Sequence, residues 1–410
     1  MNFYIAFCVL VSCAFSVDSA IINTKTNLNS ELSNKIGNFS VDFIGRTLAS
    51  EAPNANLIFS PITLWTVLGV IAEGAAGRTL KQVCDVLRIK PEDRPNVRAT
   101  FRTIQKYLVV TTSTVELKKL NIMFVDKKLS PKKNFSNISS AYDVSFAPLN
   151  FSAPQQTADF VNQRVNAFTK GRITELVNSK DLLQSHMILT SALYFKGQWT
   201  YKFDESSTTL RPFYDSNGNK MGEVNMMTNR HTFPFANIGA IQARVLELPY
   251  GKENRLSLLI MLPYPNVSVK DMFNNLHNYS LDMMFGDIAT SVKEFPDDEI
   301  IVYLPRFKIE SELDLTGSLM AMGVRDLFDD TQADLSDMVN VPTYVSKISH
   351  KAIIEVTEEG TTASAATSAI FGNRIGSTRF EVNRPFGFMI VEKTTNTIAF
   401  SGSYNKPQLY

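Results

Sequence analysis

The order of hydrophobic patterns along the chain is the feature that most restricts its fold. Apolar residues in the first half mostly recur with helical spacing, whereas the second half contains mainly short apolar segments with the length of strands. No stretch rich in proline, glycine or serine separates the halves, although 410 residues would by length suggest two or three domains. With 44% hydrophobic residues the chain can bury one large core, so we predict a single α+β domain.

The individual elements follow from the same patterns. Helices are predicted over residues 30–49, 57–73 (opened by the capping pair Ser60-Pro61), 78–89, 96–109, 157–168 and 315–322. Strands are predicted over residues 115–125, 188–195, 243–248, 256–262 and 300–304. Residues 386–392 and 398–404 form a predicted hairpin with Thr395 and Asn396 at its turn.

Residues 1–20 have the pattern of a secretory signal peptide. The apolar run over residues 3–15 is too short to span a membrane, and small residues follow it, although no lysine or arginine precedes it. Cleavage after Ser16 and cleavage after Ala20 both fit this pattern. The mature domain, residues 21–410 if cleavage follows Ala20, is therefore expected to be secreted, extracellular and not bound to a membrane.

Cysteines and glycosylation sequons fit an exported chain. Cys8 and Cys13 leave with the signal peptide, so Cys84 cannot form an intrachain disulfide, and we predict that it is buried in a helix rather than a reactive thiol. The sequon at Asn38 lies within a helical pattern and is the weakest glycosylation candidate. The other candidates are Asn134, Asn137, Asn150, Asn266 and Asn278.

The sequence contains no enzyme motif. Lysine and arginine (41) balance aspartate and glutamate (40), so the overall charge favours neither nucleic acid nor an acidic substrate. Nucleophile-elbow, zinc-protease, dinucleotide and phosphate-loop motifs are all missing. The four histidines, His186, His231, His277 and His350, are scattered, and we expect structural or exposed roles for them, with no catalytic or metal-binding residue. A triad assembled from distant positions remains an alternative.

One segment near the C-terminus has an unusual composition. Residues 361–369 contain nothing larger than threonine, and neither proline nor a charge occurs between Thr361 and Asn373. A plain linker has this composition, and so does a segment that is cut and then moved. Arg374 is the first charged residue after the run.

Short motifs follow one another in a specific order along the whole mature chain, although each motif alone is weak. They are LIFSP (57–61), EGAAGRT (73–79), YFKGQW (194–199), LPRF (304–307), LF (327–328), HKA (350–352), EEGT (358–361) and NRPF (383–386). This ordered set resembles the serpins, the serine-protease-inhibitor superfamily, and is closer to arthropod than to vertebrate members. The resemblance implies a monomeric single-domain serpin fold, in which helices pack around a large central mixed sheet with further sheets. A reactive-centre loop would be exposed over residues 358–382.

The resemblance also implies a mechanism for the small-residue segment. A serine protease would attack the loop and form an acyl-enzyme, and the cut loop would insert as a new strand and trap the enzyme; serpin loop insertion is itself a known case of strand addition. Thr361, Ala363, Ala365, Thr367 and Ala369 would then share one face, and all are small enough for a packed interior. The implied hinge comprises Glu358, Glu359, Gly360, Thr361, Ala363, Ala365, Ala366 and Thr367.

The family pattern places the scissile bond at Arg374–Ile375. Arg374 is fourteen residues after Gly360 and eleven before Pro385, so counts from both ends agree. An arginine at this position suits a trypsin-like protease, because an aspartate in its specificity pocket pairs with the guanidinium. The preceding subsites would take Phe371, Gly372 and Asn373, and Arg379 is a weaker second site.

This sequence departs from the family at two positions, and it leaves a carrier role as the alternative function. Ser191 replaces the usual asparagine, and Arg164 stands where an aromatic residue is common. By analogy the sheet-opening region comprises Ser60, Thr63, Ser191 and His350. Non-inhibitory serpins, which act as carriers or binding proteins, often have large, charged or proline residues in the hinge, and this chain has none of them there.

Two features of the sequence point to further partners. Arg94, Arg98, Arg102 and Lys106 lie at four-residue spacing, and Lys118, Lys119, Lys132 and Lys133 could extend them into a heparin-binding surface. An ordinary solvated helix face is the preferred interpretation, and no other cofactor is expected. The Arg-Ile bond resembles zymogen activation sites, which suggests an extracellular immune or melanisation cascade as the setting.

Overall fold

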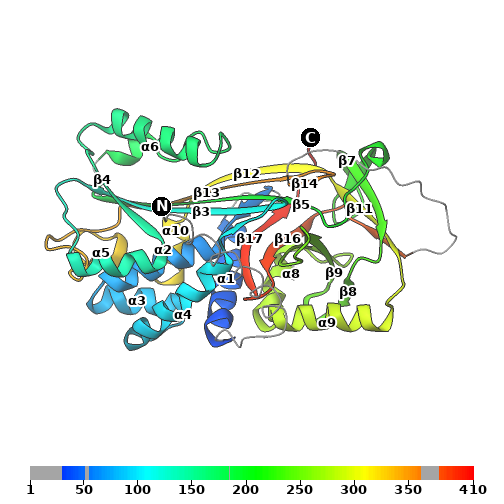
Figure 1. The fold of residues 1–410 in the computed structure, drawn as a ribbon, viewed down its shortest axis with the longest axis horizontal. Helices are drawn as coiled ribbons and strands as arrows, with labels where there is room; N and C mark the ends of the chain where they lie inside the picture. Colours follow the sequence, from blue (N-terminus) through cyan, green and yellow to red (C-terminus); the bar gives the residue numbers. More distant parts are fainter. Residues whose placement is uncertain (1–29, 51–54, 184, 362–377) are drawn as a thin grey trace, which may run out of the picture.

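A computed structural model describes residues 30–50, 55–183, 185–361 and 378–410. These residues form three β-sheets with helices packed around them, which confirms the α+β class (Figure 1). Within these ranges, none of the helices has the length and apolar character needed to cross a membrane.

The central sheet has seven strands and mixes parallel and antiparallel pairs. β13 runs parallel to β5, whereas β3 and β12 are antiparallel to their neighbours β5 and β13. β14 pairs with β5, and β4 pairs with β3. The strands in order are β12 (Phe307–Asp314), β13 (Lys347–Val356), β5 (Met187–Gln198), β3 (Val115–Asp126) and β2 (Val110–Thr111), with β14 (Gly360–Thr361) and β4 (Val144–Leu149) beside them.

The other two sheets have six and four strands. The first contains β1 (Leu57–Phe59), β17 (Thr397–Tyr404), β16 (Phe386–Glu392), β10 (Leu256–Pro263), β9 (Ala243–Tyr250) and β8 (Phe235–Ile238). The second contains β15 (Thr378–Glu381), β11 (Ile300–Pro305), β7 (Lys220–His231) and β6 (Thr209–Tyr214). The predicted C-terminal hairpin is confirmed as β16 and β17, and Asn396 takes the positive φ of its turn.

Helices cover both faces of the central sheet. Figure 1 shows α6 on one face and α2 to α5 on the other. Every residue of α2 is buried, and its N-terminus is capped by the Ser60 hydroxyl, which accepts a hydrogen bond from the Thr63 amide at 3.4 Å. The helices are α1 (Ser30–Ser50), α2 (Pro61–Gly74), α3 (Gly77–Leu87), α4 (Arg94–Tyr107), α5 (Lys133–Ser139), α6 (Pro154–Phe168), α7 (Ser179–Leu182), α8 (Val269–Asn275), α9 (Leu281–Glu294) and α10 (Thr316–Met322).

The predicted helices and strands all exist, with ends shifted by a few residues, and the segment 57–73 divides into β1 and α2. The helix α9 was not predicted, because only Met284 and Ile288 are buried in it, and so narrow an apolar stripe gives a weak helical signal. Cys84 is buried in α3 as predicted, and burial raises the pKa of its thiol to about 11, which makes it a poor nucleophile.

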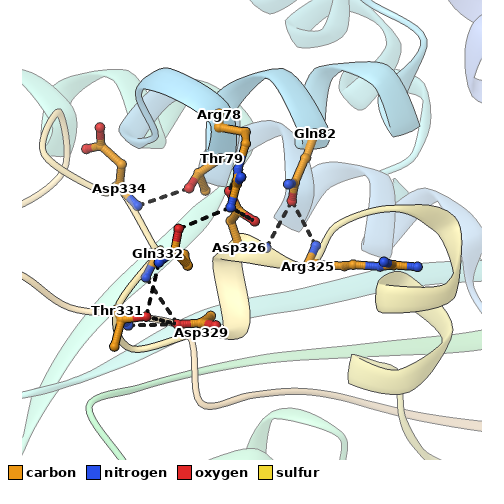
Figure 2. Close-up of polar contacts among 9 residues, drawn as sticks. All are labelled: Arg78, Thr79, Gln82, Arg325, Asp326, Asp329, Thr331, Gln332 and Asp334. Carbon is orange, nitrogen blue, oxygen red and sulfur yellow. Dashed lines mark hydrogen bonds and ion pairs between the residues drawn. The ribbon is translucent and has the colours of Figure 1, made fainter.

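Two of the motifs that carry the family resemblance meet in a polar network between α3 and the segment 325–334 (Figure 2). The Arg78 guanidinium makes a bidentate ion pair with Asp326, and its Nη2 also donates to Gln332 Oε1 at 3.1 Å. The Gln82 side chain accepts from the backbone amides of Arg325 and Asp326 at 2.8 and 2.9 Å. The network fixes the segment that leads into β13, which is one wall of the site described next.

Candidate functional site

The hinge already contacts the central sheet. Gly360 and Thr361 form β14, which pairs antiparallel with Gln198 and Gly197 at the end of β5. Gly360 has a φ of +123°, a conformation that favours glycine, and a Cβ there would lie 2.2 Å from the carbonyl oxygen of Gly197. The chain therefore needs glycine at this position to approach β5 as closely as it does.

Buried polar contacts hold the two glutamates before the hinge. The Glu359 carboxylate forms an ion pair with Lys202 at 2.6 Å. The Glu358 carboxylate accepts from the Thr208 hydroxyl at 2.7 Å and lies 3.7 Å from Arg306. Both glutamates are buried, so these partners are needed to offset the loss of hydration. The base of the predicted loop is thus fixed on the protein body.

Most of the predicted reactive-centre loop lies outside the described residues, including hinge, subsite and reactive-bond positions. They are Ala363, Ala365, Ala366, Thr367, Phe371, Gly372, Asn373, Arg374 and Ile375. On the far side of the gap the chain resumes in β15, which runs parallel to β11. Arg379, the weaker tryptic candidate, lies within this strand, and its carbonyl accepts a hydrogen bond from Arg244 at 3.0 Å. A protease would have to pull Arg379 out of a sheet to cut after it.

The structure brings the four predicted sheet-opening residues together. His350 on β13 lies directly opposite Ser191 on β5, and His350 Nδ1 is 2.7 Å from the Ser191 hydroxyl oxygen. The backbone amide of Ser60 donates to His350 Nε2 at 2.9 Å. Because Nε2 accepts, the proton of the neutral ring sits on Nδ1, which donates to Ser191. Thr63 Oγ1 lies 3.4 Å from the same serine oxygen.

This cluster depends on a neutral histidine. His350 is fully buried, and burial lowers its pKa to about 4. A proton on Nε2 would remove the acceptor of the Ser60 amide, which sits at the cap of α2. The line along which β5 and β13 lie side by side is called the seam below. The cluster therefore links this seam to the start of the buried helix α2.

Sequence reasoning missed one polar neighbour of this cluster. Asn121 on β3 lies opposite Ser191 in the antiparallel register and is buried. Neither its amide oxygen nor its amide nitrogen has a hydrogen-bond partner in the structure. An unpaired buried amide is destabilising, and only the strand register reveals that it lies next to Ser191.

The basic residues of α4 do not form one outward face. The Arg94 guanidinium donates to the backbone carbonyls of Pro91 and Ala72 at 2.8 and 2.7 Å. Arg98 forms an ion pair with Glu73 at 3.0 Å, and Glu73 is buried. Arg102 and Lys106 remain exposed.

The lysines proposed to extend this surface are also partly engaged. Lys119 is almost fully buried and lies 3.4 Å from Asp143, and burial lowers its pKa. Lys118 pairs with Glu116 at 2.5 Å, and Lys132 donates to the Ser336 carbonyl at 2.6 Å. Lys133 is exposed. These contacts favour the solvated-face interpretation over a heparin surface.

The glycosylation candidates differ in exposure. Asn134 and Asn137 on α5, Asn266 in a turn and Asn278 at the end of a short 3-10 helix are all exposed. Asn150 is partly buried, and its side-chain oxygen is fully enclosed without a hydrogen-bond partner. We therefore regard Asn150 as the least accessible of the five positions for a glycan.

The remaining histidines have structural or exposed environments. His231 stacks on Tyr201 with ring centroids 3.6 Å apart, and His186 packs against Tyr344. His277 is exposed and lies 2.7 Å from Asp42. Over the ranges that the structure describes, no group of histidine, cysteine, aspartate and glutamate side chains is arranged to hold a metal ion.

Comparisons with known proteins agree with this architecture. The chain is 32% identical over 358 residues to a leukocyte elastase inhibitor of Xenopus laevis, covering 86% of this chain and 93% of that protein. Human thyroxine-binding globulin has the same fold, with a TM-score of 0.80, 22% identity and coverage of 93% and 100% of the two chains.

An insect protein is also similar. The structure of Serpin48 from Tenebrio molitor, described as a highly specific serpin, matches with a TM-score of 0.74, 26% identity and coverage of 91% and 97% of the two chains. A family model described as serpin (serine protease inhibitor) matches residues 34–407. This chain therefore belongs to the serpin family, whose members are classed as protease inhibitors rather than enzymes.

Proposed function

We propose that this protein is a secreted suicide inhibitor of a trypsin-like serine protease, which is trapped after cleavage at Arg374–Ile375. The observation that carries the proposal is the pairing of β14 with β5. Gly360 and Thr361 occupy the entrance to the seam between β5 and β13, where a cleaved loop would enter. The hinge therefore already lies where strand addition would begin.

The register of β14 predicts how the loop would insert. Gly360 opposes Gln198 and Thr361 opposes Gly197, so each further loop residue would oppose the preceding residue of β5. Continued along β5, this register places Ala363, Ala365, Thr367 and Ala369 opposite Phe195, Leu193, Ser191 and Leu189. Leu189 and Leu193 belong to the hydrophobic core, so these loop residues would enter a packed interior, where small side chains fit.

The same register places the reactive bond outside the sheet. Phe371 would oppose Met187, the first residue of β5, and Arg374 would lie three residues beyond the strand. A protease acylated on Arg374 would therefore be carried to the far end of the seam. The guanidinium of Arg374 determines the protease class, because it fits a pocket with an aspartate at its base.

The signal-like N-terminus, the sequons and the Arg-Ile bond support an extracellular setting. We propose export after removal of the first residues and a target protease in an extracellular cascade such as melanisation. The proposal of heparin as an accelerator has weak support, because Arg94 and Arg98 bond to the protein body.

The test is incubation of the mature protein with trypsin, followed by denaturing electrophoresis and mass spectrometry. We expect a covalent complex and a released peptide that begins at Ile375, because acylation precedes insertion. The variant Arg374→Ala should lose the complex, whereas the matched control Arg379→Ala should keep it. Trypsin without its nucleophilic serine should form no covalent complex with either protein.

Two outcomes would overturn the proposal. Complete cleavage without a complex would mean that deacylation is faster than insertion, and the carrier role would then become the better hypothesis. A released peptide that begins at Phe380 would show that the reactive bond is Arg379–Phe380 and not Arg374–Ile375.

A further inference from the structure

The segment that connects α6 to β5 crosses the seam that a cleaved loop must open. Residues 169–186, here called the connector, include α7 and lead into β5. The Asn162 side chain on α6 accepts from the amides of Leu176 and Val177 at 2.8 and 3.1 Å and donates to the Val177 carbonyl at 2.8 Å. The connector therefore belongs to the α6 and β5 side of the seam.

Two ion pairs join the connector to β13, on the other side of the seam. Arg172 Nη1 lies 2.5 Å from Glu355 Oε2, and Lys347 Nζ lies 2.7 Å from Asp181 Oδ1. β5 and β13 pair from Ile188 with Lys347 to Leu193 with Ala352. One ion pair lies beyond the top of this paired region, next to the entry of β14, and the other lies at its lower end.

Both carboxylate oxygens of Glu355 accept hydrogen bonds. The Tyr410 hydroxyl donates to Oε1, and the Arg306 guanidinium lies 5.4 Å from the Tyr410 ring. Burial pushes the pKa of Glu355 upward, but the hydrogen bonds from Tyr410 and Arg172 and the nearby positive charges outweigh burial, so the pKa lies below its usual value. Glu355 is therefore ionised at neutral pH and presents its second oxygen to Arg172.

A neighbouring residue on the same turn makes a contact that does not cross the seam. Lys170 Nζ pairs with Glu116 on β3 at 3.0 Å. β3 and β5 stay paired along Val115 to Val125, so both partners belong to the same side. Of the two basic residues of this turn, Arg172 makes a bridge across the seam. Lys170 makes a bridge that stays intact when β5 and β13 separate.

We propose that the Arg172–Glu355 bridge, through which the connector acts as a strap across the seam, sets how fast the loop inserts. The inference rests on the proposed function, because it concerns the loop-insertion step. Entry begins at Gly360 and Thr361, so Arg172–Glu355 is the first bridge to break and Asp181–Lys347 is the last. Arg172 and Glu355 are thus positioning residues that never touch the protease.

The test measures strand entry without a protease. A synthetic peptide of residues 361–374 is mixed with the intact protein, and annealing is followed by the fluorescence of Trp199, whose indole donates to the Thr357 carbonyl at 2.8 Å beside the hinge. Arg172→Gln should anneal about fivefold faster, the effect expected from one partly exposed ion pair. Lys170→Gln should match the parent, Arg172→Lys should restore the slow rate, and Lys347→Gln should act in the same direction as Arg172→Gln.

A charge reversal separates the bridge from general packing. Arg172→Glu and Glu355→Arg should each accelerate annealing, and the double variant should recover part of the parent rate. Equal rates for the Arg172→Gln and Lys170→Gln variants would overturn the strap. A peptide that anneals to neither the parent nor any variant would also overturn it, because no bridge would then control entry.

Trapping assays on the same variants keep the two proposals distinguishable. Fewer molecules of Arg172→Gln should be consumed for each trypsin trapped, because faster insertion competes better with deacylation. If the parent forms no covalent complex but the annealing rates follow the predicted order, the proposed function fails and the strap stands. If the parent traps trypsin and the variants anneal alike, the strap fails alone.

Discussion

At the scale of single residues, His350 shows how one side chain couples two elements. Its ring accepts from the Ser60 amide at the start of α2 and donates to Ser191 on β5. The Ser60 contact requires the neutral ring, because only an unprotonated Nε2 can accept, and the proton of that neutral ring is then on Nδ1. Because Ser191 is shorter than the asparagine typical of the family, the histidine and serine approach to 2.7 Å without an amide between them. The seam is therefore held at its middle by one short neutral hydrogen bond.

Acidification should weaken the contact between His350 and the Ser60 amide. The pKa of His350 is about 4 in the folded protein against an ordinary value of 6.5, so the unfolded chain binds the proton more readily. The contribution to stability is complete above pH 6.5 and is lost as the pH falls toward 4, amounting to about 3 kcal/mol. Urea denaturation between pH 7 and 4 should show a smaller loss for His350→Gln than for the parent, and an equal slope would contradict the assignment. His277→Gln, at an exposed histidine, is the control.

At the scale of elements, the basic residues of α4 have different roles in the structure, although they are evenly spaced in the sequence. Four basic residues at regular spacing predicted one charged face. The structure turns Arg94 and Arg98 toward the body, where Arg98 pairs with the buried Glu73. Tyr142 also donates to this glutamate at 2.9 Å. The first half of the helix therefore uses its charges for packing.

Heparin binding should accordingly be weak and should depend on the second half of α4. The parent is expected to leave a heparin column at low salt, and Arg102→Ala with Lys106→Ala should remove the remaining retention. Arg98→Ala should instead lower the free energy of unfolding by about 2 kcal/mol, because it leaves a buried carboxylate without its cation. Strong retention that falls steeply with salt would contradict this view and support a polysaccharide site.

The elements differ in how well the sequence predicts them. α2 and β10 are mostly apolar and buried along their whole length, and the C-terminal hairpin has a clear turn, so their patterns are strong. β12 alternates buried and exposed residues along its whole length, yet it was not predicted, because its charged residues mask so short a strand. α9 was missed because few of its residues are buried.

At the scale of the whole molecule, the seam between β5 and β13 is the least complete part of the central sheet. The strands pair over their lower parts and diverge above Leu193 and Ala352, where β14 enters. The unpaired upper edge of β13 is a place where an added strand would gain hydrogen bonds. In the proposed mechanism, the polar links across the seam, at Arg172, Ser191 and Asp181, would have to break before that addition is complete.

Cleavage of the loop should therefore raise thermal stability. Protein cut at Arg374 is expected to melt at a higher temperature than the intact protein, because the inserted segment would complete the central sheet. Gly360→Val should melt at nearly the same temperature before and after cleavage, since its Cβ would collide with the Gly197 carbonyl and block entry. Gly286→Ala, where an added Cβ meets nothing within 4 Å, is the matched control, and equal melting of intact and cut parent protein would contradict the insertion model.

The sequence by itself determined the fold class, the family and the composition of the loop, because hydrophobic spacing and ordered motifs are local properties of the chain. It also indicated that Ser60, Thr63, Ser191 and His350 belong together, although only through family resemblance. Only the tertiary structure decided which charges face inward on α4, that Asn121 lies beside Ser191, and that Arg172 reaches Glu355 across the seam. These facts depend on strand register and helix rotation, which long-range packing sets and no local pattern encodes.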